Sequence, residues 1–155
     1  MSRRDQIQMD RDEQLALLDE ERVVIATTIG PRGWPHSMPL WFTVRDGEIW
    51  AWTFAKSQKV KNLERDPRCT LLVEAGDEYL ELRGLQIEAE AEVIRDLDTV
   101  LEFGKELTVR YSDGIDSIDG DAAAGLAAQA PKRVAIHFHP VRTASWDHRK
   151  LGGIY

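Results

Sequence analysis

The chain has 155 residues, of which 43% are hydrophobic and 30% are charged, and its formal net charge is −7. The length and composition are typical of one globular domain with one core, over residues 1–155. The acidic balance excludes nucleic acid as the expected partner, because such binding needs a broad basic surface.

The ends and the cysteine content indicate where the protein works. No apolar run approaches the roughly 18 residues of a membrane span. The N-terminal stretch "MSRRDQIQMDRDEQ" starts basic but lacks the apolar segment of a secretory signal. We therefore expect a cytoplasmic protein. Cys69 is the single cysteine, and its apolar neighbours predict a small buried hydrophobe rather than a reactive thiol.

The first half of the chain alternates turn signals with β-branched and aromatic runs. A flexible start at 1–9 precedes an amphipathic helix at 10–21, capped by Asp10 or Asp12. The patterns then predict a strand at 23–29, a turn at 30–35, a strand over "HSMPLWFTV", a tight hairpin at Asp46-Gly47 and a strand over "EIWAWTF". On that last strand, Trp50 and Trp52 share one face.

The second half begins with a short helix at Ser57. Further strands follow in 68–94, with a turn at Gly76-Asp77 and alternation across Leu80 and Leu82. A helix capped by Asp96, a loop or short helix at 112–131, a strand at 132–140 and a tail complete the chain. Many strands joined by short turns, with few helices, favour a mainly β fold: a small antiparallel barrel with flanking helices.

The segment "AKSQKVKNLERDP" places positive charge at the start of the helix that follows Ser57. The positive charges of Lys56 and Lys59 are unfavourable beside the positive partial charge of the helix N-terminus, at a cost of a few tenths to about 1 kcal/mol. A bound phosphate would reverse the sign, since it would accept bonds from first-turn amides, a serine hydroxyl and ammonium groups. The alternative is a solvated helix face whose inner side is Val60 and Leu63. Spacing alone leaves both interpretations open.

The histidines and tryptophans give weaker signals. His137 and His139 share one strand face, but no carboxylate or third histidine is obviously paired with them and Pro140 is expected to end the strand, so no metal site is expected. His36 could orient a ligand or be a turn residue without a role. Tryptophans at 41, 50 and 52 are expected in the barrel core or at a dimer interface.

The order of these segments resembles a known family. The N-terminal helix, "VVIATTIGPRGWPHSMPLWFTV", Asp46-Gly47, "IWAWTFAKSQKVKNLERDPRCTLLVE" and "LRGLQIEAEAEVI" resemble the pyridoxamine 5'-phosphate oxidase-like FMN-binding split barrels. They look most like the flavin/deazaflavin-dependent oxidoreductase branch, which uses F420. The likeness covers about 12–111 and 132–147. The chain lacks the Arg-rich phosphate cage of true pyridoxamine-phosphate oxidases, which makes vitamin B6 oxidation doubtful.

The resemblance implies a homodimer of split barrels with two cofactors at the subunit interface. The phosphate would be held by Lys56, Ser57, Gln58 and Lys59. The ring would lie against 37–40 and 52–54, and the C-terminal segment of the partner subunit would reach the site. The residues so implied as cofactor-binding, with Lys61 added for the coenzyme tail, are Ser37, Met38, Pro39, Leu40, Trp52, Thr53, Phe54, Lys56, Ser57, Gln58, Lys59, Lys61, Arg142 and Trp146.

Three functions follow from this resemblance. The first is an F420-dependent oxidoreductase that transfers a hydride to or from an unsaturated or quinone-like small molecule. F420 carries a carboxylate-rich tail beyond its phosphate, and extra cations at Lys61 and Arg65 would favour it at about 0.5–1 kcal/mol each. The alternatives are an FMN enzyme of the same fold and a non-catalytic flavin- or deazaflavin-binding protein. The residues identify no acid, base or nucleophile, so the cofactor would carry the chemistry.

Overall fold

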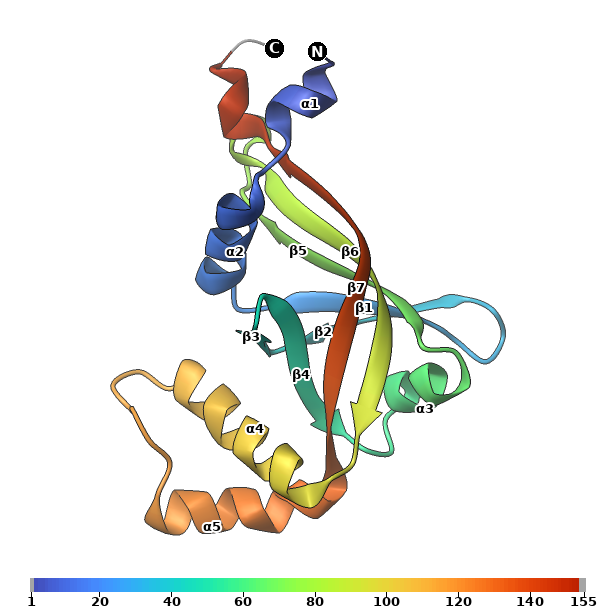
Figure 1. Ribbon diagram of the computed structural model, residues 1–155, viewed down its shortest axis with the longest axis vertical. Coiled ribbons are helices and arrows are strands. Elements are labelled where there is room, and N and C mark those ends of the chain that lie inside the picture. The colour runs from blue at the N-terminus through green and yellow to red at the C-terminus, as the bar shows by residue number, and fades with distance from the viewer. Residues whose placement is uncertain (1, 154–155) are drawn as a thin grey trace.

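The computed structural model describes residues 2–153. The protein is mainly β, with helices around one sheet (Figure 1). The helices are α1 (Arg3–Ile7), α2 (Arg11–Glu20), α3 (Gln58–Arg65), α4 (Leu97–Arg110) and α5 (Gly120–Gln129), with short 3-10 turns at Tyr79–Glu81, Ala130–Lys132 and His148–Leu151. The strands are β1 (Val24–Ile29), β2 (Pro35–Leu40), β3 (Phe42–Arg45), β4 (Glu48–Phe54), β5 (Arg68–Ala75), β6 (Arg83–Ile94) and β7 (Arg133–Asp147).

All seven strands form one antiparallel sheet in the order β2-β1-β5-β6-β7-β4-β3. Its two edge strands, β2 and β3, are separated in sequence by Trp41 alone. Opposite edges can be this close along the chain only if the sheet curls round, and β2 does contact β4. The result is the curled half-barrel that the sequence predicts for a split-barrel fold.

Two hydrophobic clusters lie on opposite faces of the sheet. The main core fills the concave side, where Val134, Ile136 and Phe138 alternate inward along β7 and the leucines of α2 close one end. A second cluster lies on the outer face, where α4 covers β4 and β7 through Phe103 and its neighbours. Trp50 and Trp52 pack into this second cluster, while the inward residues of β4 are buried in the first. Strand alternation therefore predicts the two faces correctly.

Several local predictions are confirmed by their geometry. Asp46 and Gly47 both have positive φ (52° and 77°) in the β3–β4 hairpin, as a tight turn requires. Asp10 accepts the Glu13 N–H at the start of α2, and Asp96 accepts the Thr99 N–H at the start of α4. Within 112–131, a loop leads into α5 (Gly120–Gln129), which packs against α4.

Four expectations differ from the structure. The stretch "HSMPLWFTV" is two edge strands, because the chain turns the barrel corner at Trp41. Leu80 lies in a 3-10 turn rather than a strand, because residues 76–82 form the connection between β5 and β6. The 141–147 part of the expected tail continues β7. Residues Arg3–Ile7 form a short helix in the segment expected to be flexible.

The continuation of β7 through Pro140 has a visible cause. Pro140 pairs opposite Ala89, where a shift of register interrupts the β6–β7 ladder between Glu88 and Ala89. A bulge is a place where a strand tolerates proline, because no ladder bond is lost there. Among the helices described, none is both long and apolar enough to cross a membrane.

Candidate functional site

Three residues separate the end of β4 at Phe54 from the start of helix α3 at Gln58, and the first turn of α3 has free backbone N–H groups. Ser57 precedes the helix in an extended conformation (φ −67°, ψ 154°), and the Lys61 N–H donates to Ser57 O at 3.2 Å. The N–H groups of residues 58–60 therefore lack helical acceptors. Ser57 does not cap them, and its Oγ is buried with no hydrogen-bond partner in the described structure. A buried hydroxyl without a partner is uncommon, so Ser57 Oγ is free to bond to a ligand or water oxygen.

The rest of α3 is fixed to the sheet. The buried Asn62 amide donates to Thr28 Oγ1 at 2.9 Å and accepts from Gln58 Nε2 at 2.8 Å. Arg65 donates to the Ile29 carbonyl. These bonds hold the helix at the end of β1, so the direction of its first turn is set by the core rather than by a surface loop.

The lysines of the cluster point in two directions. Lys59 turns inward, where its Nζ donates to Thr53 Oγ1 at 3.1 Å, and burial lowers the pKa of Lys59. Lys56 and Lys61 are exposed, as a solvated helix face predicts. The inward position of Lys59 is not explained by that interpretation, because a partly desolvated ammonium is unfavourable without an anion.

The two ends of α3 differ in charge compensation. At the C-terminal end Glu64 pairs with Arg95, and Arg68 pairs with Asp66, lowering the pKa of that carboxyl to about 2. At the N-terminal end, no carboxylate of residues 2–153 pairs with Lys56 or Lys59. Positive charge is therefore neutralised at one end and left uncompensated at the other.

Arg133 lies on the outer face of the sheet at the end of β4, next to this site, and sequence reasoning missed it. It pairs with Phe54 across β4 and β7, and its Cζ lies 3.5 Å from the Phe54 ring centroid and 4.7 Å from that of Trp52. Burial lowers the pKa of Arg133, and its Nε is buried without a partner in the described structure. Only the long-range pairing of β4 with β7 brings this guanidinium to the end of β4.

The residues expected against a cofactor ring are divided between two strands. Positions 37–40 lie on edge strand β2, with Met38 exposed and Ser37 Oγ 2.8 Å from Thr27 Oγ1. The Trp52 ring packs against α4 on the outer face, whereas Thr53 faces inward. The structure thus brings Thr53, Ser57 and Lys59 together. The edge strand β2 contacts β4, the strand that carries Thr53.

Arg142 and Trp146 are not brought to α3 within one chain. Both lie on the half of β7 that runs away from α3 towards α1 (Figure 1). Trp146 packs over Gly84, and Arg142 is exposed 3.9 Å from Glu88. A role for these two residues at the site therefore needs a second subunit.

A cavity of about 370 Å³ lies on the sheet beside β1, β5 and β6. It contains none of the residues predicted to bind the cofactor. Its lining includes Thr27, Pro35, Cys69, Ala89 and Val141. Thr28, which accepts a hydrogen bond from Asn62, also lines the cavity. The cavity therefore adjoins the place where α3 is bound to β1.

Comparisons with known proteins agree with this fold. The family model described as pyridoxamine 5'-phosphate oxidase matches residues 11–147. A conserved hypothetical protein from Mycobacterium tuberculosis has 37% identity and a TM-score of 0.89, over 100% of this chain and 95% of that one. No curated protein matches significantly.

Two more distant structures share the fold alone. An F420 reductase has 24% identity and a TM-score of 0.63, over 83% of this chain and 94% of that chain. A heme storage protein from Vibrio cholerae has 14% identity and a TM-score of 0.64, over 88% of this chain and 95% of that chain.

Proposed function

Because this chain belongs to the pyridoxamine 5'-phosphate oxidase family, we propose that it is an oxidoreductase that uses the deazaflavin coenzyme F420. The substrate class would be an unsaturated or quinone-like small molecule. The observation that carries the proposal is the uncompensated cationic start of α3, with the buried Ser57 hydroxyl that has no partner among the described residues.

The donors at α3 fit a phosphate. The amides of residues 58–60, Ser57 Oγ and the ammonium of Lys59 would supply it with hydrogen bonds and charge. Such convergence of first-turn amides with a hydroxyl and an ammonium is typical of phosphate sites. Lys59 would exchange its bond to Thr53 for the phosphate, and Lys56 would add charge from solvent.

Residues of β4 and β2 would orient the ring. Arg133 lies over Phe54 and Trp52 and so fixes the end of β4, where the backbone of 52–54 approaches α3. Across the barrel edge, Ser37, Met38, Pro39 and Leu40 would cover the other side. When bound, the deazaflavin supplies hydride transfer, and the protein's part is to hold ring and substrate in register and to exclude water.

The preference for F420 over FMN depends on cations beyond the phosphate. Lys61 is exposed and makes no ion pair within residues 2–153, so it is available to a carboxylate tail. Arg65 is already engaged with Ile29 and Asn62, which leaves it less suited to that role. FMN remains the alternative cofactor, because it shares the ring, ribityl chain and phosphate.

We propose a homodimer as the active form. The predicted ring-binding strand β2 is an edge of the sheet, so in one chain this side of the site is open. Arg142 and Trp146 of the partner subunit would close it.

Cofactor titration tests the proposal. We expect F420 fluorescence to be quenched on binding to purified protein, with FMN binding more weakly. Lys59→Ala should weaken F420 binding by about 10- to 150-fold, which corresponds to about 1.5–3 kcal/mol, because a charge-assisted bond to the phosphate is lost.

Lys105→Ala is the matched control, because Lys105 is a surface lysine of α4 paired with Glu102. It should leave the affinity unchanged. Equal affinities for wild type and Lys59→Ala, with both proteins folded, would remove the phosphate site. A yellow preparation with tightly bound FMN would instead favour the FMN alternative.

A second candidate function is cofactor binding without turnover, since the same fold serves a heme storage protein. Steady-state oxidation of reduced F420 with a panel of enones and quinones separates the two. Turnover with any acceptor supports the oxidoreductase, whereas tight binding without turnover supports a binding protein.

A further inference from the structure

Four side chains from three adjacent strands meet on the outer face of the sheet. His137 and His139 both point outward from β7. Glu48 is the first residue of β4, and Glu92 on β6 lies opposite His137. No pattern along the chain pairs either carboxylate with the histidines. The strand register does so, because β7 runs between β4 and β6.

Each carboxylate faces a different pair of ring nitrogens. Glu48 Oε2 contacts His137 Nε2 and lies 3.9 Å from His139 Nδ1. Glu92 Oε2 lies 2.9 Å from His139 Nε2 and 3.9 Å from His137 Nδ1. The two imidazole rings, with centroids 3.9 Å apart, therefore stand between two carboxylates.

We propose that Glu48, His137 and His139 bind a divalent transition metal ion, with Zn²⁺ as the reference ion. Donor atoms from these three residues all lie within 4.8 Å of one another. Ligands bound to one Zn²⁺ at about 2.0–2.1 Å are about 3.4 Å apart, so small side-chain rotations would complete the set. Two imidazoles and one carboxylate are ligands that suit Zn²⁺ and similar ions better than Ca²⁺ or Mg²⁺.

Glu92 would act as the outer partner of the site. A neutral imidazole donates from one nitrogen and offers a lone pair on the other. If His139 donates from Nε2 to Glu92, its Nδ1 is left to face Glu48 and the metal. Such a carboxylate behind a metal-binding histidine fixes the tautomer and the orientation of the ring.

The surroundings are compatible with an open metal site. The side chain of His137 is 17% exposed and that of His139 47%, so an ion can enter from solvent while one histidine is held by packing. The His137 ring stacks on Trp50 with centroids 4.2 Å apart and planes at 17°. Three protein ligands leave at least one position for water or another small ligand.

This site is separate from the proposed cofactor site. Glu48 and Phe54 stand at opposite ends of β4, six residues or about 20 Å apart along the strand. The metal proposal therefore does not depend on F420, and either can fail alone.

Calorimetric titration of the untagged full chain with ZnCl2 tests the proposal. We expect one ion per chain. His139→Gln and Glu48→Gln should each weaken binding by at least about 100-fold. Glu92→Gln should weaken it by about 10- to 100-fold, which is the usual effect of losing an outer partner.

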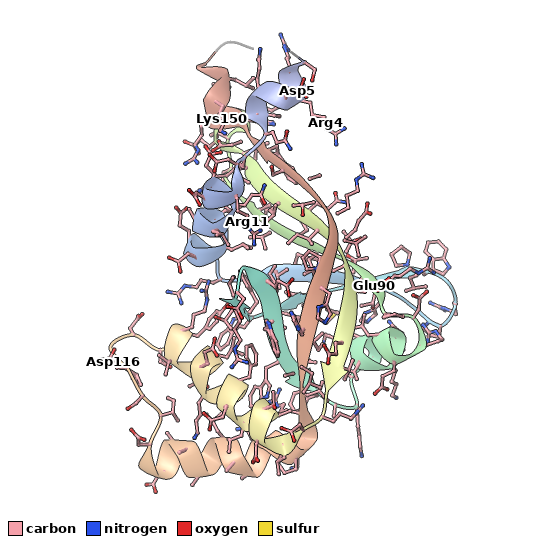
Figure 2. The ribbon with its side chains drawn as sticks, in the orientation of Figure 1. Arg4, Asp5, Arg11, Glu90, Asp116 and Lys150 are labelled. Carbon is pink, nitrogen blue, oxygen red and sulfur yellow. The ribbon has the colours of Figure 1, made fainter. Side chains whose placement is uncertain are left out.

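Two variants serve as controls. Asp116 is an exposed carboxylate in the loop between α4 and α5, away from β6 and β7 (Figure 2), so Asp116→Asn should bind Zn²⁺ like wild type. His148 lies at the other end of β7 against the Tyr79 carbonyl, so His148→Gln should also be unchanged. No binding by wild type, or equal binding by wild type and His139→Gln, would overturn the proposal.

A spectroscopic measurement checks the location of the ion. Ni²⁺ bound at His137 should quench the fluorescence of the stacked Trp50, and Trp50→Phe should remove that part of the quenching. Circular dichroism of each variant confirms that it is folded. Quenching that persists unchanged in Trp50→Phe would place the ion elsewhere and contradict the assignment.

Discussion

Cys69 shows how burial alone decides the chemistry of one residue. It lies on β5, its Sγ donates weakly to the Ala89 carbonyl, and burial raises the pKa of its thiol to about 12. At pH 8.5 the reactive thiolate is therefore very scarce in the native protein. We expect alkylation by iodoacetamide at pH 8.5 to be at least about 100-fold slower in native than in urea-unfolded protein, as measured by mass spectrometry.

The same shift fixes the sign of a pH effect on stability. The native thiol keeps its proton to a higher pH than the unfolded thiol, so the free energy of unfolding should fall as the pH rises above about 9. Cys69→Ala should lack this contribution. Rapid labelling of the native protein would show that the thiol is accessible and the pKa unperturbed.

At the scale of elements, the Trp146 ring of β7 can lie over β6 because residue 84 has no side chain. A Cβ at Gly84 would lie 2.2 Å from the Trp146 ring, so Gly84→Ala must displace that ring. We expect it to lower the free energy of unfolding by about 1–3 kcal/mol, as overpacking does. Urea unfolding measures this.

A double-mutant cycle identifies the cause. If the ring is what the new methyl group meets, Gly84→Ala should be much less damaging in a Trp146→Ala background. Equal effects in both backgrounds would mean that the backbone of β6, and not Trp146, is responsible.

Elements with local signals were predictable and those set by distant partners were not. Asp46-Gly47 and the Asp10 and Asp96 caps act within a few residues, so their geometry followed from sequence. The break at Trp41 has no such signal, because β2 and β3 separate only when they pair with β1 and β4.

The same limit applied to the sites. Ser57 and Lys59 are neighbours in sequence and could be identified together, whereas Arg133 meets Phe54 only through the β4–β7 ladder. Glu48 and Glu92 reach the histidines of β7 in the same way, from two different strands. A pattern along the chain shows which face a residue takes but not what stands opposite.

At the scale of the whole molecule, exposed apolar side chains near the large cavity support the proposed dimer. Trp34 is 73% exposed and Val141 69%, and Val141 lines the cavity with Pro35. Such a patch on a small protein is characteristic of an interface. We expect sedimentation velocity to show a dimer, and Val141→Lys to shift it towards monomer because it would bury an unpaired charge.

The control is Val23→Lys, which changes another exposed valine that does not line the cavity. It should leave the dimer intact. A monomeric wild type at micromolar concentration, or a Val141→Lys protein that stays fully dimeric, would exclude this surface as the interface.

The position of β7 between β6 and β4 governs how the chain can fold while it is being synthesised. Until residues 133–147 leave the ribosome, the β3–β4 hairpin has no ladder partner in the rest of the sheet, although it was made some 80 residues earlier. A nascent chain that stops short of β7 would thus hold two unjoined pieces with open strand edges, which are prone to mispairing. Both proposed ligand sites use residues of β7 or pack against it, so neither can be completed before β7 has been synthesised.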